Sequence, residues 1–104
     1  MTQRIKVGVD ERVPVKLTAS QRDLILNHTF AGADVTGPLV IAPLVGTRIL
    51  VHYTLSDIED LMGFVAAEAN HSEDLKLRRK LERLCDYLHT FEDRYEDELS
   101  APRS

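Results

Sequence analysis

The sequence has few of the covalent and aromatic features that stabilise many small proteins. Its 104 residues include one cysteine, Cys85, and no tryptophan. A single cysteine allows no disulfide within the chain and no Cys-x-x-Cys pair for zinc or thiol redox chemistry, and it fits a reducing compartment. The fold must therefore be held by packing alone, and a chain of this length buries roughly 65% of its unfolded surface.

Long apolar runs are missing too. The first ten residues, MTQRIKVGVD, hold no apolar core of signal-peptide length, and the longest apolar run extends only from Pro38 to Val45. That run is far shorter than the ~20 residues that cross a bilayer. We therefore expect a cytoplasmic protein with no membrane partner. The formal net charge of −4 also disfavours a protein built mainly to hold nucleic acid.

Catalytic motifs are equally scarce. The chain contains no glycine-rich phosphate loop and no nucleophile elbow. Its composition, 43% hydrophobic and 29% charged, is that of an ordinary globular protein. We expect a single domain over residues 1–98 with a flexible tail over 99–104, no catalytic residues and no cofactor.

The first part of the chain has the apolar pattern of strands. Apolar residues occupy only odd positions, the period that places them on one face of a sheet: Ile5, Val7, Val9, Val13, Val15 and Leu17. We expect a hairpin that turns between Asp10 and Arg12 and sets Val9 opposite Val13. Pro14 cannot donate a hydrogen bond to a neighbouring strand, so its strand is expected to lie at an edge or to leave one side free.

A second strand pattern follows over 47–54, where Ile49, Val51 and Tyr53 share one face and both faces are fairly apolar. This pattern is typical of a central strand. Between the two strand regions, the apolar segment 37–46 contains two prolines. It either packs under the other elements or contacts a partner, and the first alternative is favoured because unexplained apolar stretches in small domains usually belong to the core.

Two pairs of polar residues have capping-box spacing. Thr18 with Gln21 predicts a short helix that ends near His28, and Ser56 with Glu59 predicts the start of a second helix. Ser72 is expected to cap a third helix, whose apolar residues alternate in steps of four and three. These residues form the predicted self-association seam: Leu77, Leu81, Leu84, Leu88, Phe91 and Tyr95.

The seam must pack on something. If residues 70–72 form a tight bend, its partner is the preceding helix, whereas one continuous rod would pack on another copy of the chain. The sequence thus predicts an α+β fold, in which a small antiparallel sheet of two to three strands is packed by a short helix and by a C-terminal helical hairpin or long helix. A homodimer is expected.

The sequence also contains candidates for two other kinds of site. Glu68 with His71, and Asp86 with His89, have a carboxylate-x-x-histidine spacing that could begin a metal site. However, Glu68 borders the apolar helix face whereas Asp86 lies on the polar face, so only Glu68 and His71 remain as candidate ligands. A basic stripe on the last helix could contact phosphates, although a solvated face is the more common reason for such charges. The stripe consists of Lys76, Arg79, Lys80 and Arg83.

The favoured interpretation is a non-catalytic protein-interaction or regulatory module. It would self-associate through its C-terminal helices, and it could also bind another protein. The alternatives are a nucleic-acid-binding accessory protein that uses the basic stripe, and a metal-binding protein that uses Glu68 and His71.

Overall fold

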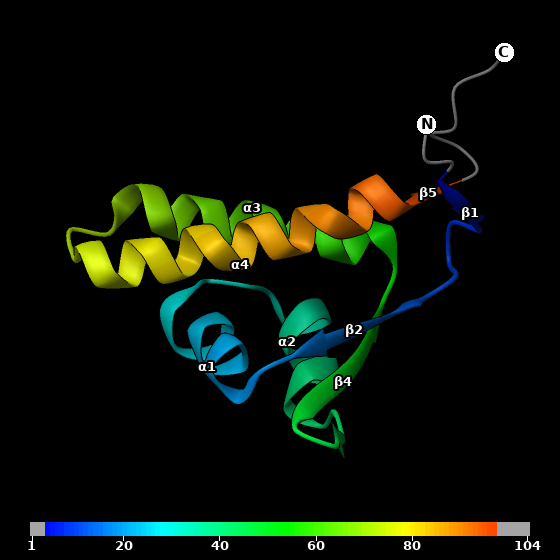
Figure 1. Cartoon of the computed structure of the whole chain (residues 1–104), viewed down its shortest axis with the longest axis horizontal. Coiled ribbons are helices and arrows are strands. Elements are labelled where there is room, and N and C mark those ends of the chain that lie inside the picture. Colours follow the sequence, from blue (N-terminus) through cyan, green and yellow to red (C-terminus); the bar gives the residue numbers. More distant parts are fainter. Residues whose placement is uncertain (1–3, 98–104) are drawn as a thin grey trace, which may run out of the picture.

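The fold is α+β, as the sequence predicts. The computed structural model describes residues 4–97, so the tail predicted over 99–104 lies outside the described residues. The described part contains four helices and five strands (Figure 1). In chain order these are β1 (Ile5–Val7), β2 (Val13–Leu17), α1 (Ala19–His28), α2 (Ala33–Val40), β3 (Leu44–Val45), β4 (Arg48–Tyr53), α3 (Leu55–His71), α4 (Leu75–Arg94) and β5 (Tyr95–Asp97).

The helices α3 and α4 form an antiparallel hairpin, and α1, α2 and the sheet of β2, β3 and β4 lie on one side of it (Figure 1). The core lies between these two parts and contains apolar residues from both, including Val15, Ile49, Leu61 and Leu88. No polar or charged residue of the described range is buried. Packing without a disulfide is therefore sufficient for this fold, as the single cysteine requires.

The three-stranded sheet has the order β2-β4-β3 and is antiparallel throughout. The register sets Val13 opposite Tyr53 and Leu17 opposite Ile49. Every second residue of β2 and β4 is buried, because one face of the sheet covers the core and the other faces solvent. The predicted central position of β4 and the predicted edge position of the strand with Pro14 are both confirmed.

The predicted hairpin, which turns between Asp10 and Arg12 and sets Val9 opposite Val13, is wrong. β1 pairs in parallel with β5, with Ile5 opposite Tyr95, and β2 pairs with β4 instead. The connecting segment turns at Gly8, whose carbonyl accepts from the Glu11 amide at 3.0 Å. Alternation shows which face of a strand is buried but not which strand lies beside it, and pairing with β4 places the buried residues of both strands on the same face of the sheet.

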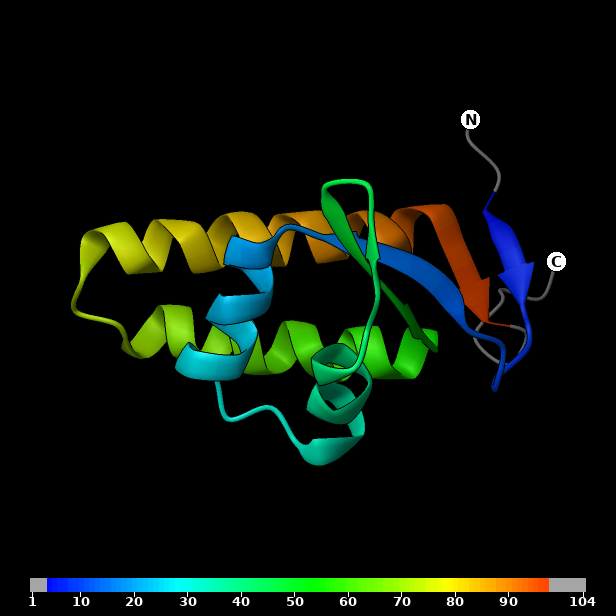
Figure 2. The same ribbon diagram turned by 90° about the horizontal axis from the view of Figure 1, so that it is seen from below.

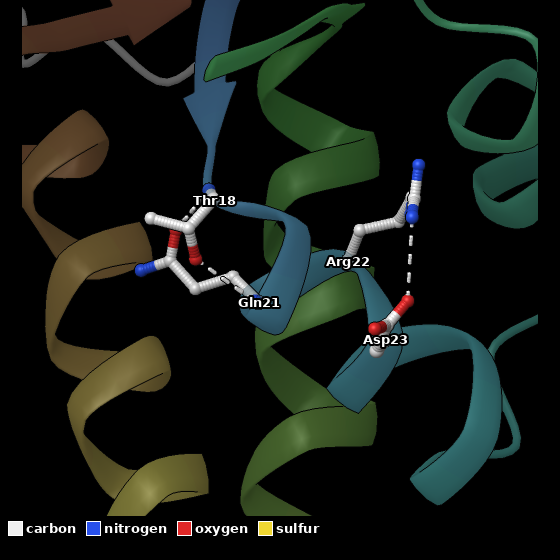
Figure 3. A network of polar contacts seen from close by, with 4 residues as sticks. All are labelled: Thr18, Gln21, Arg22 and Asp23. Carbon is white, nitrogen blue, oxygen red and sulfur yellow. Dashed lines mark hydrogen bonds and ion pairs between the residues drawn. The ribbon is translucent and has the colours of Figure 1, made fainter. Parts of the chain in front are cut away.

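The first helix begins where the sequence predicts. Thr18 and Gln21 form the capping box, with distances of 2.8 Å from the Thr18 amide to the Gln21 side chain and 3.0 Å from the Gln21 amide to the Thr18 hydroxyl. Figure 3 shows this pair beside Arg22 and Asp23, which form a surface ion pair at 3.5 Å. The helix ends at His28, as expected.

The other two predicted helix starts are each displaced by two residues. α3 is capped by Thr54 with Asp57, not by Ser56 with Glu59, because Thr54 is the first residue after β4 and still has an extended backbone. α4 is capped by Asp74, not Ser72, and the Asp74 carboxylate accepts from two amides of the first turn. Residues 72–74 therefore form the corner between the helices, and of the two predicted arrangements the structure has the hairpin.

Candidate functional site

An exposed apolar surface lies where α2 leads into β3, and we call its four residues the apolar tip. Their side chains are 65%, 83%, 69% and 48% exposed, respectively: Val40, Ile41, Leu44 and Val45. This part of the chain lies on the side of the molecule away from the helical hairpin (Figures 1 and 2). No charged residue occurs from Val35 to Thr47, so no charged group of that segment keeps this surface hydrated.

The geometry of α2 explains why the tip is exposed. Val35 and Leu39 are one helical turn apart, and both are buried against the core. Each residue turns the helix by about 100°, so Val40 and Ile41 point away from the face that Leu39 buries. The prediction that the Pro38–Val45 segment belongs mainly to the core is therefore wrong, because only Leu39 of that segment is fully buried.

The β3 edge of the sheet is open. The Leu50 amide donates to the Pro43 carbonyl at 2.9 Å, so Pro43 and Leu50 form a hydrogen-bonded pair. Bonded and non-bonded pairs alternate in an antiparallel ladder, and Leu44 opposite Ile49 is therefore a non-bonded pair. The backbone N–H and C=O of Leu44 consequently point away from β4, toward the free edge.

The β2 edge is partly blocked by two features. The same alternation directs the backbone groups of Pro14 and Lys16 away from β4, but Pro14 has no N–H to offer. The Lys16 carbonyl is already engaged, because it accepts a hydrogen bond from the Tyr87 hydroxyl of α4 at 2.6 Å. The β2 edge is thus partly blocked, with the Lys16 N–H and the Pro14 carbonyl still directed outward, whereas Leu44 of β3 offers both a donor and an acceptor.

Contact with β2 also extends the basic stripe. Tyr87 follows Arg83 by four residues and Lys80 by seven, so it shares their side of α4. Its hydrogen bond to Lys16 places β2 beside that side of the helix. We call the resulting exposed surface the basic flank, and it consists of Lys16, Lys76, Arg79, Lys80 and Arg83. Within residues 4–97 none of these five side chains forms an ion pair.

The candidate metal ligands are both on the last turn of α3. Glu68 is half-buried and His71 is exposed. In the described part of the chain, no three His, Cys, Asp or Glu side chains come together in a way that could hold a metal ion. The second pair of this spacing is on the surface of α4, where His89 lies 3.5 Å from Glu92. Within residues 4–97, Glu68 and His71 therefore have no third ligand of these types beside them.

The predicted self-association seam is largely covered inside the chain. Leu81, Leu84, Leu88 and Phe91 are between 0% and 4% exposed. The remaining two, Leu77 and Tyr95, are partly buried and pack against the same core. The seam therefore packs within a single chain, against α3 and the rest of the core. Self-association through this seam is untested and stays a prediction.

A shallow hollow of about 340 Å³ lies at the opposite end of the hairpin from its corner. It is lined by the start of α3, the end of α4 and residues next to them: Arg4, Leu55, Ser56, Glu59, Glu92, Tyr95 and Glu96. Three of these seven are carboxylates, so the hollow would favour a cationic group.

The thiol of Cys85 has no features of a nucleophile. Burial raises the pKa of Cys85, and the neighbouring carboxylates of Asp86 and Glu92 raise it further. The thiol is therefore protonated at neutral pH, whereas a reactive cysteine needs the thiolate. The buried hydroxyl of Tyr53 is also raised in pKa, first by burial and then by Asp57, and it donates a hydrogen bond to the Val35 carbonyl.

No protein-family model, no curated protein and no solved structure matches this chain. Across residues 4–97, none of the helices combines the length and the apolar character that a membrane span requires. Two features escaped prediction from the sequence: the open backbone of Leu44 and the contact between Tyr87 and Lys16. The uncharged run of residues 35–47 was the available signal for the first, whereas the second joins residues 71 positions apart.

Proposed function

We propose that this protein is a non-catalytic protein-interaction module that docks through its apolar tip. The observation that carries this proposal is the exposure of four large apolar side chains beside an open sheet edge. The interaction role is the one that the sequence predicts, but the proposed surface is different. The predicted seam on α4 is already covered, whereas the tip is free.

Energetics support a docking role for the tip. Fully burying a Val, Leu or Ile side chain stabilises by about 1.5–3 kcal/mol. The four tip residues are about half to four-fifths exposed, so burial by a partner would contribute on the order of 5 kcal/mol. The largest exposed apolar patch of a small protein is often functional. A cytoplasmic location belongs to the same proposal and is supported by the single free cysteine.

Site-specific photocrosslinking in cells tests this function. A benzoylphenylalanine at position 41, where the native Ile41 is 83% exposed, should crosslink to a discrete protein. The matched control places the same group at Ala67, an exposed residue on the outer face of α3. Leu44→Asp should abolish the crosslink at position 41, because a buried, unpaired carboxylate opposes docking. Equal crosslinking at positions 41 and 67, or none at either, would rule out the tip as the docking surface.

A second candidate function, the binding of a nucleic acid by the basic flank, is favoured by one observation. The Tyr87 contact adds Lys16 of β2 to the four basic residues of α4, so positive charge from two elements adjoins. The observation against this candidate is the net charge of −4. Phosphate contacts make affinity fall steeply with salt, since bound counterions are released.

The test of this second candidate is a salt titration of binding to a duplex and to a single strand. Lys16→Gln and Arg83→Gln should each weaken binding and reduce the salt slope by about 1. Arg78→Gln is the control, since Arg78 is exposed on the opposite side of α4. Binding that is absent at low salt, or equally affected by all three variants, would eliminate this function.

A further inference from the structure

We infer that the apolar tip docks a second copy of this chain, with β3 of one copy pairing antiparallel to β3 of the other. This inference rests on the proposed function of the tip as a docking surface. The two sheets would join edge to edge around a two-fold axis at Leu44. The combined sheet would have six strands in the order β2-β4-β3-β3-β4-β2.

The backbone of β3 provides the bonds for this pairing. The N–H and C=O of Leu44 point away from β4, as the hydrogen bond from Leu50 to Pro43 requires. When two such edges meet around a two-fold axis, each Leu44 can donate its N–H to the C=O of the other Leu44. Neither strand has to give up a hydrogen bond within its own sheet.

The other edge cannot serve in the same way. At β2, Pro14 has no N–H and the Lys16 carbonyl is occupied by the Tyr87 hydroxyl. Natural sheets commonly protect their edges by such means, because an unprotected edge pairs with other chains. The β2 edge keeps an outward Lys16 N–H and an outward Pro14 carbonyl, but neither residue can both donate and accept as Leu44 can.

The charge pattern around the tip favours a second copy as the occupant. A two-fold contact brings each residue close to its own counterpart, so any charged patch would meet its own sign. Residues 35–47 contain no charge, although the chain as a whole carries −4. The segment that forms the tip therefore brings no like charges of its own together, and the charged residue that the register places beside it is Arg48, opposite Val45 on β4.

The available area also favours a second copy over an extended peptide. A peptide strand and a second copy would gain the same two hydrogen bonds at Leu44, but the peptide would have to supply its own apolar side chains. A second copy supplies four matching ones. The exposed tip amounts to roughly 400 Å² per copy, about half of the ~800 Å² that each partner of a standard interface buries. The expected dimer is therefore weak and transient.

Sedimentation equilibrium of the purified full chain, from ~1 µM to ~1 mM, tests the dimer across the range in which a weak complex forms. The wild type should change from monomer to dimer, and Leu44→Asp should remain a monomer throughout. Leu75→Asp is the matched control, since Leu75 is 64% exposed and Leu44 is 69% exposed, and it should dimerise as the wild type does. Circular dichroism should show that both variants keep their helices. A wild type that stays monomeric, or equal effects of the two variants, would overturn the inference.

A disulfide test checks the position of the two-fold axis. Directly paired residues of this type have Cα atoms about 5.5 Å apart, within reach of a disulfide. In a Cys85→Ser background, Leu44→Cys should give a covalent dimer on mild oxidation, whereas Leu75→Cys should not. Equal disulfide formation at the two positions would overturn the β3 pairing.

The photocrosslinking described above distinguishes the β3 dimer from docking of a different protein at the apolar tip. A crosslink from position 41 to the chain itself supports the β3 dimer. A crosslink to a different protein, with the purified chain monomeric, overturns the dimer but leaves the interaction module intact. No crosslink at position 41 overturns both.

Discussion

The two free edges of the sheet differ in how they are protected. On the β2 side, Pro14 has no N–H and the Tyr87 hydroxyl occupies the Lys16 carbonyl, so the Lys16 N–H and the Pro14 carbonyl are the groups that still point outward. On the β3 side, Leu44 has an open N–H and C=O and is surrounded by exposed apolar side chains. A protein that partly blocks one edge and leaves the other open limits where a partner strand can add. We therefore expect a partner strand to add at β3 and not at β2.

The largest expected effect tests whether the buried face of α4 is part of the hydrophobic core. Leu88→Ala removes a side chain that is 0% exposed and faces the interior from α4. The free energy of unfolding should fall by about 2–5 kcal/mol, because burial is lost and a cavity remains. Urea denaturation at low protein concentration measures this value without a contribution from dimerisation. A loss below about 0.5 kcal/mol would place Leu88 at an exposed position instead.

The next effect concerns the hydrogen bond that joins α2 to β4, from the Tyr53 hydroxyl to the Val35 carbonyl. Tyr53→Phe removes the hydroxyl that donates to the Val35 carbonyl and leaves that carbonyl without its partner. The free energy of unfolding should fall by about 1–3 kcal/mol. Because the tip begins at the last residue of α2, hydrogen exchange should also become faster at Val40 and Ile41.

The same tyrosine predicts a dependence on pH. Burial raises the pKa of Tyr53, so the folded state holds the proton more tightly than the unfolded state does. Stability from this group is complete below the ordinary tyrosine pKa of about 10 and is lost as the pH rises above it. The wild type should therefore lose up to about 1.4 kcal/mol per pH unit from this group above pH ~10, and Tyr53→Phe should lack this component. Equal slopes for the two proteins would contradict the prediction.

A smaller effect is expected at the partly blocked β2 edge. Tyr87→Phe removes the hydrogen bond to the Lys16 carbonyl and frees that carbonyl for another strand. The free energy of unfolding should fall by about 0.5–1.5 kcal/mol. Pro14 still withholds a donor, so sedimentation should show no new oligomer. A new oligomer formed by Tyr87→Phe alone would show that the tyrosine is the main protection of this edge.

The smallest effect is expected at the open edge itself. Leu44→Ala truncates a side chain that is 69% exposed in the single chain. Monomer stability should change by no more than about 0.5 kcal/mol, although dimerisation should weaken. A leucine-to-alanine change that costs several kcal/mol at position 88 and almost nothing at position 44 would confirm the contrast between covered and open surfaces.

The sequence predicted which faces are buried better than it predicted which strands pair. Alternation correctly placed Val15, Val51 and Tyr53 on the core face, because burial depends on a local period. The pairing of β1 with β5 joins the two ends of the described chain, and no local pattern encodes such a contact. The helix starts at Thr54 and Asp74 were missed by two residues because polar residues that can cap a helix occur close together there.

The candidate surfaces were harder to predict for a related reason. The apolar character of residues 38–45 was evident, but their exposure depends on the direction in which α2 turns Val40 and Ile41. The basic residues of α4 were identified in full, whereas Lys16 joins them only because Tyr87 contacts β2. The apolar tip and the basic flank both depend on tertiary packing, which the periodicity of the sequence does not predict.

The parallel pairing of β1 with β5 has a topological consequence. Because Ile5 lies opposite Tyr95 and Val7 opposite Asp97, residues 4 and 97 are separated by only about three residues of extended chain, roughly 10 Å. The two ends of the described chain are therefore close together, and a short linker could join them. A circular permutant joined there and opened at the 72–74 corner would keep every helix and strand, and its new ends would lie at the corner of the helical hairpin, well away from the apolar tip.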